Sequence, residues 1–295
     1  MTLSNKEPSF SAETSTTLAD RVERLKELRS MLENRGLRAA PTRISHYIKI
    51  LDKFAFQTFR NQIENIAEIT YSVREADELL WIFKGLKIAS PPGIYEVLEK
   101  SVGGAVYTKD EHGENRARNF QLELRIASYF IQAGIKVDLS KESDLVASIN
   151  GKTLHVECKR LESTKKVMIR FKEAYKQLKR RYEQDRTLKK TYGLVVFDIS
   201  KIVTPKQDIL VDSSDIAIRD KIRKSLKDFD LQYDCTPIFC KDKRLISIWY
   251  QAIIPALSLS KLKPSARFSS LHTICSLAGH RAPIFYSLKK VFEIC

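Results

Sequence analysis

The stretch that decides the expected fold is Ser143-Asp-Leu-Val-Ala-Ser-Ile-Asn-Gly-Lys-Thr-Leu-His-Val-Glu-Cys-Lys-Arg160. Its Asn150-Gly151 pair separates two short runs that are rich in Val, Ile, Leu and Thr. Asn-Gly favours a type I′ turn, because both central residues of that turn need a positive φ. With these two residues as the loop, Ile149 faces Lys152. The sequence therefore predicts a β-hairpin whose register is fixed by its turn.

This register brings three charged side chains to one face of the hairpin. Counting outward from the turn places Asp144 opposite Glu157, with Cβ atoms roughly 4.5–5.5 Å apart, and strand alternation puts Lys159 on the same face. The other face is apolar and suits a core: Leu145, Ala147, Ile149, Leu154, Val156 and Cys158. Two carboxylates about 5 Å apart repel by on the order of 3 kcal/mol at an effective dielectric of about 20. A divalent cation with oxygen ligands would offset this repulsion; the alternative is a chance acidic pair relieved by Lys159.

Asp144 followed by Glu157-Cys158-Lys159 resembles the motif of the PD-(D/E)xK nuclease superfamily. The resemblance implies that Asp144 and Glu157 hold Mg²⁺, or Mn²⁺ in its place, and that Lys159 positions and activates the attacking water. Ser143 departs from the motif, which has Pro before the Asp. The fold class that the resemblance implies is α/β: a restriction-endonuclease-like core, with a mixed central sheet flanked by helices. Apolar residues at helical spacing add an all-helical N-terminal domain before this core.

A helix expected over residues 114–133 carries a further carboxylate on its apolar stripe. Glu123 lies on the stripe formed by Phe120, Ala127, Phe130 and Ile131. A carboxylate on a buried face needs a cation or donors to offset its desolvation. The interval from Glu123 to Gly134 is similar to that between the first-helix Glu and the following Gly in the nuclease family, so the resemblance implies Glu123 as a third metal-site acid. The alternatives are a Glu123 that reaches solvent, or Glu114 in this role.

The segment after the hairpin is strongly basic. From Lys159 to Lys190, thirteen Lys or Arg residues stand against four Asp or Glu, within a chain of net charge +15. A basic surface of this kind suits a polyanion through phosphate contacts and counterion release; a generally basic protein is the alternative. We expect a nucleic acid, DNA rather than RNA, to be contacted by Arg160, Lys165, Lys166, Arg170, Lys172, Lys176 and Gln177. Gln177 is included because some members of the family place a Gln of the helix that follows the hairpin near the metal.

Composition shifts and helix-stop signals divide the chain into four parts. Residues 1–16 are rich in Ser, Thr and Glu and read as a disordered tail, and residues 17–104 form a helical N-terminal domain with periodic apolar residues. Residues 105–254 hold the nuclease-like domain. It includes a buried strand over 193–199, a helix over 213–229 that turns Ile216, Ile222, Leu226 and Phe229 inward, and strands over 238–239 and 245–254. Residues 255–295 receive no assignment.

Composition excludes several classes of protein. The chain is 43% hydrophobic and 29% charged, which is ordinary for a globular protein. It has no apolar run of about 18 residues and no signal-peptide hydrophobic region, so we expect a cytoplasmic protein without a membrane partner. The five cysteines are odd in number and scattered, which predicts free thiols rather than a disulfide framework or a zinc site. The sequence contains no P-loop, dinucleotide-binding motif or nucleophile elbow.

These observations favour a Mg²⁺-dependent phosphodiesterase, an endonuclease that acts on DNA. Two alternatives stay open: a nucleic-acid-binding module that retains the fold without hydrolysis, and an RNA-directed nuclease. Double-strand cutters of this fold often act as dimers, so a homodimer is a further open expectation.

Overall fold

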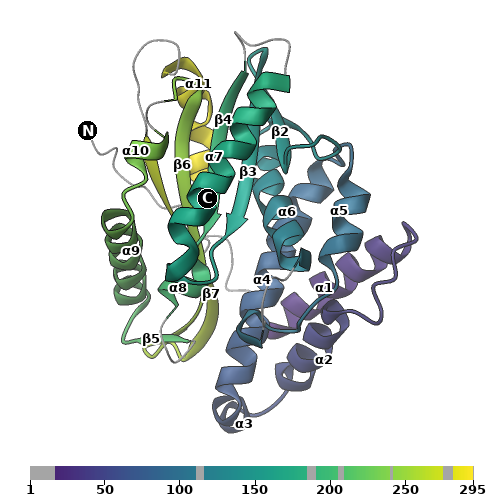
Figure 1. Cartoon of the computed structure of the whole chain (residues 1–295). Helices are drawn as coiled ribbons and strands as arrows, with labels where there is room; N and C mark the ends of the chain where they lie inside the picture. Colours follow the sequence, from purple (N-terminus) through teal and green to yellow (C-terminus); the bar gives the residue numbers. More distant parts are fainter. Residues whose placement is uncertain are drawn as a thin grey trace.

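The computed structural model describes residues 17–110, 116–184, 191–204, 209–239, 242–274 and 282–294. The predicted tail over 1–16 and the rival metal ligand Glu114 lie outside these residues. The chain adopts an α/β fold in which helices flank a mixed, curled sheet (Figure 1). This confirms the predicted α/β class.

Capping and apolar spacing set the N-terminal helices. The first begins after Thr17, whose hydroxyl accepts a hydrogen bond from the N–H of Asp20 at 3.1 Å, while the Asp20 carboxylate accepts one from the N–H of Thr17 at 2.9 Å. This reciprocal pair is a capping box. The region contains α1 (Leu18–Glu33), α2 (Arg43–Ala55), α3 (Phe59–Glu64), α4 (Ile66–Ile88), α5 (Ile94–Ser101) and a 3₁₀ turn, η2 (Thr108–Asp110). The predicted helical character is confirmed.

The next elements run in the order of helix, three strands, helix and strand. They are α6 (Arg116–Gln132), β1 (Lys136–Asp138), β2 (Leu145–Ile149), β3 (Lys152–Arg160), η3 (Thr164–Lys166), α7 (Val167–Gln184) and β4 (Thr191–Asp198). Strands β1, β2 and β3 form an antiparallel meander, and β4 pairs with β3 in parallel. All of β4 is buried, as expected of a strand covered by helices on both faces.

The rest of the chain completes the sheet. It contains α8 (Ser200–Val203), β5 (Leu210–Asp212), α9 (Asp215–Gln232), α10 (Thr236–Phe239), β6 (Leu245–Ser258), β7 (Lys263–Ile274), α11 (Ala282–Ser287) and α12 (Lys289–Ile294). The strand order is β1-β2-β3-β4-β6-β5, with β7 antiparallel to β6. Strand β6 pairs in parallel with β4 along its first half and with β5 near its end.

Two expectations for this region are wrong. Residues 238–239 belong to the short helix α10 instead of a strand, and Pro237 lies in its first turn, where a proline is tolerated. Ile216 is 61% exposed, and Ile218 is buried in its place. The reason is helical spacing: the buried face of α9 runs through positions 218, 222, 226 and 229, and a residue two positions before 218 lies on another side of the helix. The helix begins after Ser214, whose hydroxyl accepts a hydrogen bond from the N–H of Ala217.

Two apolar layers enclose the sheet. Alternate residues of β4 point into different layers: Leu194 and Val196 pack with α4 and α6, while Val195 and Phe197 pack with α7 and α9. The first layer also takes in α1, α2 and α5. The boundary predicted at residue 104 therefore remains a prediction, and the core runs across it.

Helix α4 is buried around most of its circumference, charged residues included. The guanidinium of Arg74 lies 2.8 Å from Glu78 and 3.0 Å from Glu75. Arg125 of α6 donates to Glu78 at 2.6 Å and to Asp198, at the end of β4, at 3.0 Å. This buried ionic network ties the N-terminal helices to the sheet, and each of its charges has an opposite partner, as burial requires.

Candidate active site on the β2–β3 hairpin

The hairpin forms with the predicted turn and register. Asn150 and Gly151 have φ values of 50° and 71°, and the ladder runs from the Ile149–Lys152 pair to the Leu145–Val156 pair. The residues that this register turns to the other face pack in the layer under α6. The charged face therefore lies toward α7.

Asp144, Glu157 and Lys159 meet at the end of this ladder. Asp144 directly precedes β2, and its Oδ2 accepts a hydrogen bond from the backbone N–H of Cys158 at 2.7 Å. The Nζ of Lys159 lies 3.5 Å from Asp144 Oδ2 and 3.4 Å from Glu157 Oε2. It also donates to the Cys158 carbonyl at 3.1 Å. The three predicted catalytic side chains are thus brought together.

Burial and mutual charge interactions shift the pKa values of the groups in this site. Glu157 is 1% exposed, and burial, reinforced by Asp144 and opposed by Lys159, raises its pKa to about 7. Burial alone would lower the pKa of Lys159, but Asp144 and Glu157 outweigh it and raise that pKa. Burial also raises the pKa of the Cys158 thiol. Glu157 therefore gains or loses a proton close to neutral pH, where added cationic charge would hold it ionised.

Glu123 interacts electrostatically with this group. It projects from α6 and is half-buried, and burial, followed by repulsion from Asp144, raises its pKa to about 9. Within the residues that the structure describes, no group of three or more His, Cys, Asp and Glu is close enough to hold a metal ion. The structure therefore brings Asp144 and Glu157 together, and the role of Glu123 as a third metal ligand stays a prediction.

Arg181 of α7 is a site residue that the sequence prediction missed. Its side chain is buried, and its Nε lies 3.8 Å from Glu157 Oε1. Its two terminal nitrogens bind the carboxylate and the backbone carbonyl of Glu142, two residues before Asp144. Arg181 thus links the β1–β2 loop to β3. Its spacing from Ala174 and Leu178 places it on the apolar stripe of α7, which is the sequence signal that could have distinguished it from the exposed basic residues.

Ser143, which stands where the nuclease motif has Pro, makes a specific contact. It is buried, and its hydroxyl lies 2.8 Å from Nδ1 of His155 on β3. This bond joins the two segments that carry Asp144 and Glu157. The departure from the motif therefore coincides with a polar contact across the start of the hairpin.

The oxygen atoms of the site suit a hard divalent cation. Asp144 Oδ2, Glu157 Oε2 and the Cys158 carbonyl oxygen all surround one cationic nitrogen. In addition, Glu157 Oε1 is buried and accepts no hydrogen bond from any residue that the structure describes. Carboxylate and carbonyl oxygens are the ligands that Mg²⁺ and Mn²⁺ prefer. The residues present therefore fit such an ion, with Asp144 and Glu157 as the carboxylates that would hold it.

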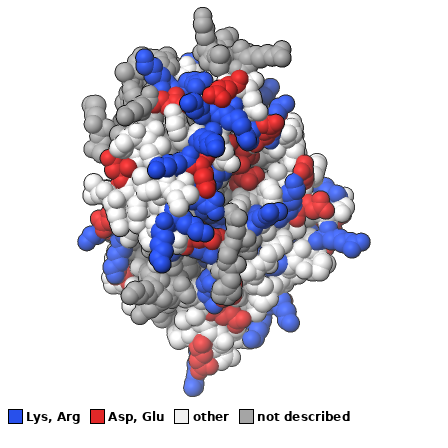
Figure 2. Space-filling model, in the orientation of Figure 1, with Lys and Arg blue, Asp and Glu red and all other residues white. Residues whose placement is uncertain are grey.

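The predicted nucleic-acid contacts lie on and before α7. Lys165, Lys166, Lys172 and Lys176 are exposed. Arg170 is half-buried and pairs with Glu173 at 2.9 Å. Burial raises the pKa of the Asp198 carboxyl, but Arg125 and then Arg160, its register partner, outweigh burial and lower that pKa. Gln177 is half-buried, with a buried Oε1 that no described residue contacts by a hydrogen bond. On the face drawn in Figure 2, over which α7 runs, Lys and Arg side chains gather with acidic residues among them.

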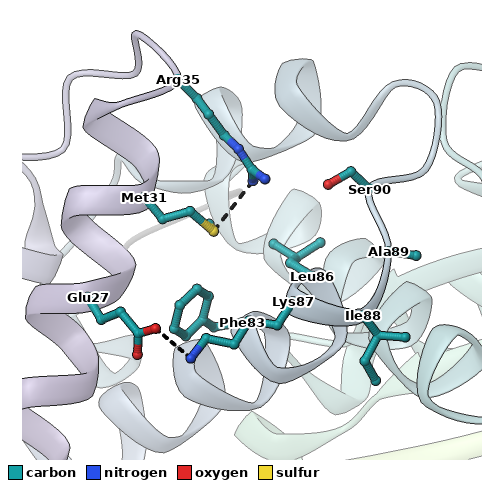
Figure 3. Close-up of a pocket in the computed structure, with 9 residues that line it drawn as sticks. All are labelled: Glu27, Met31, Arg35, Phe83, Leu86, Lys87, Ile88, Ala89 and Ser90. Carbon is teal, nitrogen blue, oxygen red and sulfur yellow. Dashed lines mark hydrogen bonds and ion pairs between the residues drawn. The ribbon is translucent and has the colours of Figure 1, made fainter.

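A pocket of about 380 Å³ lies elsewhere, between α1 and the end of α4 (Figure 3). Its charged side chains already have partners within the pocket: Lys87 pairs with Glu27 at 2.6 Å, and Arg35 donates a hydrogen bond to the sulfur of Met31 at 3.4 Å. None of Asp144, Glu157 and Lys159 lines it. The hollow therefore offers no support to the chemistry of the hairpin.

Among the helices that the structure describes, none has both the length and the apolar character that crossing a bilayer demands. Cys158 and Cys235 form no disulfide, and the other three cysteines lie outside the described residues. No protein-family model, curated protein or solved structure matches the chain.

Proposed function

We propose that this protein is a metal-dependent nuclease with a restriction-endonuclease-like core, which hydrolyses phosphodiester bonds as an endonuclease on DNA. One observation supports the proposal: Asp144 Oδ2, Glu157 Oε2 and the Cys158 carbonyl oxygen converge on a single cation, the ammonium nitrogen of Lys159. An acidic pair of this kind on a buried hairpin is costly unless it is used.

Each residue has a role that its contacts suggest. Asp144 and Glu157 would hold Mg²⁺ or Mn²⁺, which when bound polarises the phosphate and lowers the pKa of a bound water. The Cys158 N–H fixes the orientation of the Asp144 carboxylate. The Lys159 ammonium would orient the attacking water and stabilise negative charge that develops on the phosphate. Arg181 holds the β1–β2 loop against Glu157.

The exposed lysines of η3 and α7 would hold the nucleic-acid backbone. Phosphate contacts of this type release counterions, so binding should weaken steeply as salt is raised. They carry no sequence information by themselves. The proposal therefore predicts salt-sensitive binding in which base sequence has little influence through this helix.

The test is cleavage of supercoiled plasmid by the pure protein with Mg²⁺ or Mn²⁺, repeated with EDTA. Asp144→Asn, Glu157→Gln and Lys159→Met should each lower the cleavage rate by about 100-fold or more, with circular dichroism confirming that each variant is folded. Glu162→Gln is the matched control, because Glu162 is an exposed carboxylate that directly follows the hairpin. It should cleave at the wild-type rate.

Full activity in any two of the three variants would exclude this active site. Salt-sensitive binding of DNA without cleavage would instead identify a binding module that retains the fold. Parallel digestion of labelled DNA and RNA decides the substrate, and cleavage of RNA alone would reverse the preference for DNA.

A further inference from the structure

The ammonium of Lys159 lies among the same oxygens that the proposed metal ion would use. It is 3.1 Å from the Cys158 carbonyl, 3.4 Å from Glu157 Oε2 and 3.5 Å from Asp144 Oδ2. An ammonium group has three N–H donors and no acceptor, so these three oxygens satisfy it. The Lys159 side chain is 17% exposed, which means that it reaches the oxygens from the solvent edge of the site.

A lysine in this position and a divalent cation exclude each other. Both are attracted by the same two carboxylates, and their like charges repel at contact distance. The three contacts of the ammonium are at the long end of, or beyond, ordinary hydrogen-bond distances, and its four-carbon stem is flexible. The lysine can therefore leave without moving the hairpin backbone. The second oxygen of Glu157 faces Arg181 instead, and the departure of Lys159 leaves that contact in place.

We propose that Lys159 competes with the divalent cation for Asp144, Glu157 and the Cys158 carbonyl, so that cation binding displaces the ammonium toward solvent, where the phosphodiester would lie. This inference rests on the proposed function, because it assumes that the oxygens bind a divalent ion. It adds that the lysine reaches its working position only when the ion is present. Lys159 would then keep the acidic pair neutralised in the absence of the cation and engage the substrate in its presence.

The experiment is titration of the full chain with Mn²⁺ in a calorimeter, without nucleic acid, at about 0.1 M and about 0.5 M KCl. Lys159→Met keeps most of the side-chain length and removes the charge. If the ammonium occupies the oxygens nine-tenths of the time or more, its removal tightens Mn²⁺ binding by about tenfold or more at both salt concentrations. Lys141→Met is the matched control: it removes the same charge from an exposed lysine three residues before Asp144. It should change the affinity by less than about threefold, and less still at high salt.

Three results would overturn the inference: unchanged or weaker Mn²⁺ binding by Lys159→Met, equal tightening in Lys141→Met, or an absence of Mn²⁺ binding in both Lys159→Met and the wild type. The last result would also remove the proposed function. Tighter binding by Lys159→Met together with a wild-type protein that cleaves no nucleic acid would support the competition and refute the nuclease. Lys159→Gln provides the same comparison if the Met variant does not fold.

Discussion

Replacing Arg125 with Met should destabilise the fold by about 3–5 kcal/mol, the range measured when one partner of a buried ion pair is removed. Arg125 is fully buried, and it bridges Glu78 of α4 to Asp198 of β4 at 2.6 and 3.0 Å. The substitution leaves both carboxylates buried with less compensation. Each keeps another partner: Glu78 pairs with Arg74, and Asp198 accepts from the N–H and hydroxyl of Ser200. Met fills most of the vacated volume, so the loss reflects charge more than packing.

The assay is urea unfolding at pH 7, followed by circular dichroism and by the fluorescence of the two tryptophans. Arg116→Met is the control, since Arg116 is exposed at the start of the same helix; its effect should stay within about 0.5 kcal/mol. The double variant Arg125→Met/Glu78→Gln should recover part of the loss, because it removes one stranded charge. A loss below about 1 kcal/mol for Arg125→Met would refute the claim that this bridge holds the buried network together.

Substitutions at Glu157, Arg181 and Gly85 test three separate features of the structure. Glu157 has a folded-state pKa of about 7 against an ordinary 4.5, so its carboxylate opposes folding increasingly as pH rises between these values. Glu157→Gln should therefore stabilise the fold at pH 8 by up to about 3 kcal/mol and should not stabilise it at pH 4. Urea unfolding at both pH values is the measurement. Arg181→Met should lower plasmid cleavage and speed hydrogen exchange in the loop that holds Glu142. Arg181→Lys should rescue both in part, because lysine retains the charge but lacks the planar guanidinium with its several N–H donors. Gly85→Ala should cost about 1–3 kcal/mol in unfolding free energy, since its Cβ would lie 2.4 Å from Ser128 Oγ and 2.8 Å from the Ser128 Cα.

Each of these has a result that contradicts it. A stability gain from Glu157→Gln that is the same at pH 4 and pH 8 would show that charge is not its source. Unaltered exchange in the loop after Arg181→Met would remove its anchoring role, and complete rescue by lysine would reduce that role to charge alone. For the glycine, Gly103→Ala is the control, because a Cβ there meets open space; equal losses at both positions would rule out the contact with α6.

The hairpin and its charged face could be predicted from sequence because the information is local. The Asn150-Gly151 turn fixes the register, and two-residue alternation then sorts the neighbouring side chains between the faces. The role of Arg181 was not predicted because its partners are remote in the chain: Glu142 lies 39 residues earlier. A buried arginine on a helix full of basic residues carries no local mark beyond its position on the apolar stripe.

Other parts of the fold depend on pairings between segments that are distant in the sequence, and the residue pattern of one segment does not reveal such pairings. Strand β7 carries Lys, Pro, Ser and Arg in place of a clear apolar alternation, and it is a strand because β6 pairs with it along its length. The charged residues of α4 resemble a solvent-facing surface, and their burial is tolerable because arginines of α1 and α6 pair with them: Arg21 with Asp77, Arg118 with Glu75 and Arg125 with Glu78. Tertiary context overrides local pattern in both cases.

The interior position of α4 has a consequence for how this molecule can be dissected. A chain begun after residue 104 would lack Glu78, leaving Arg125 with Asp198 alone, and would strip Trp81 from the aromatic contacts that it makes with Tyr129 and Phe268. The hairpin would lose the part of its apolar layer that α4 supplies. Slow amides in α4 and in β4 should accordingly exchange through one shared global opening, so that the amino-terminal third behaves as scaffold for the hairpin rather than as a detachable appendage.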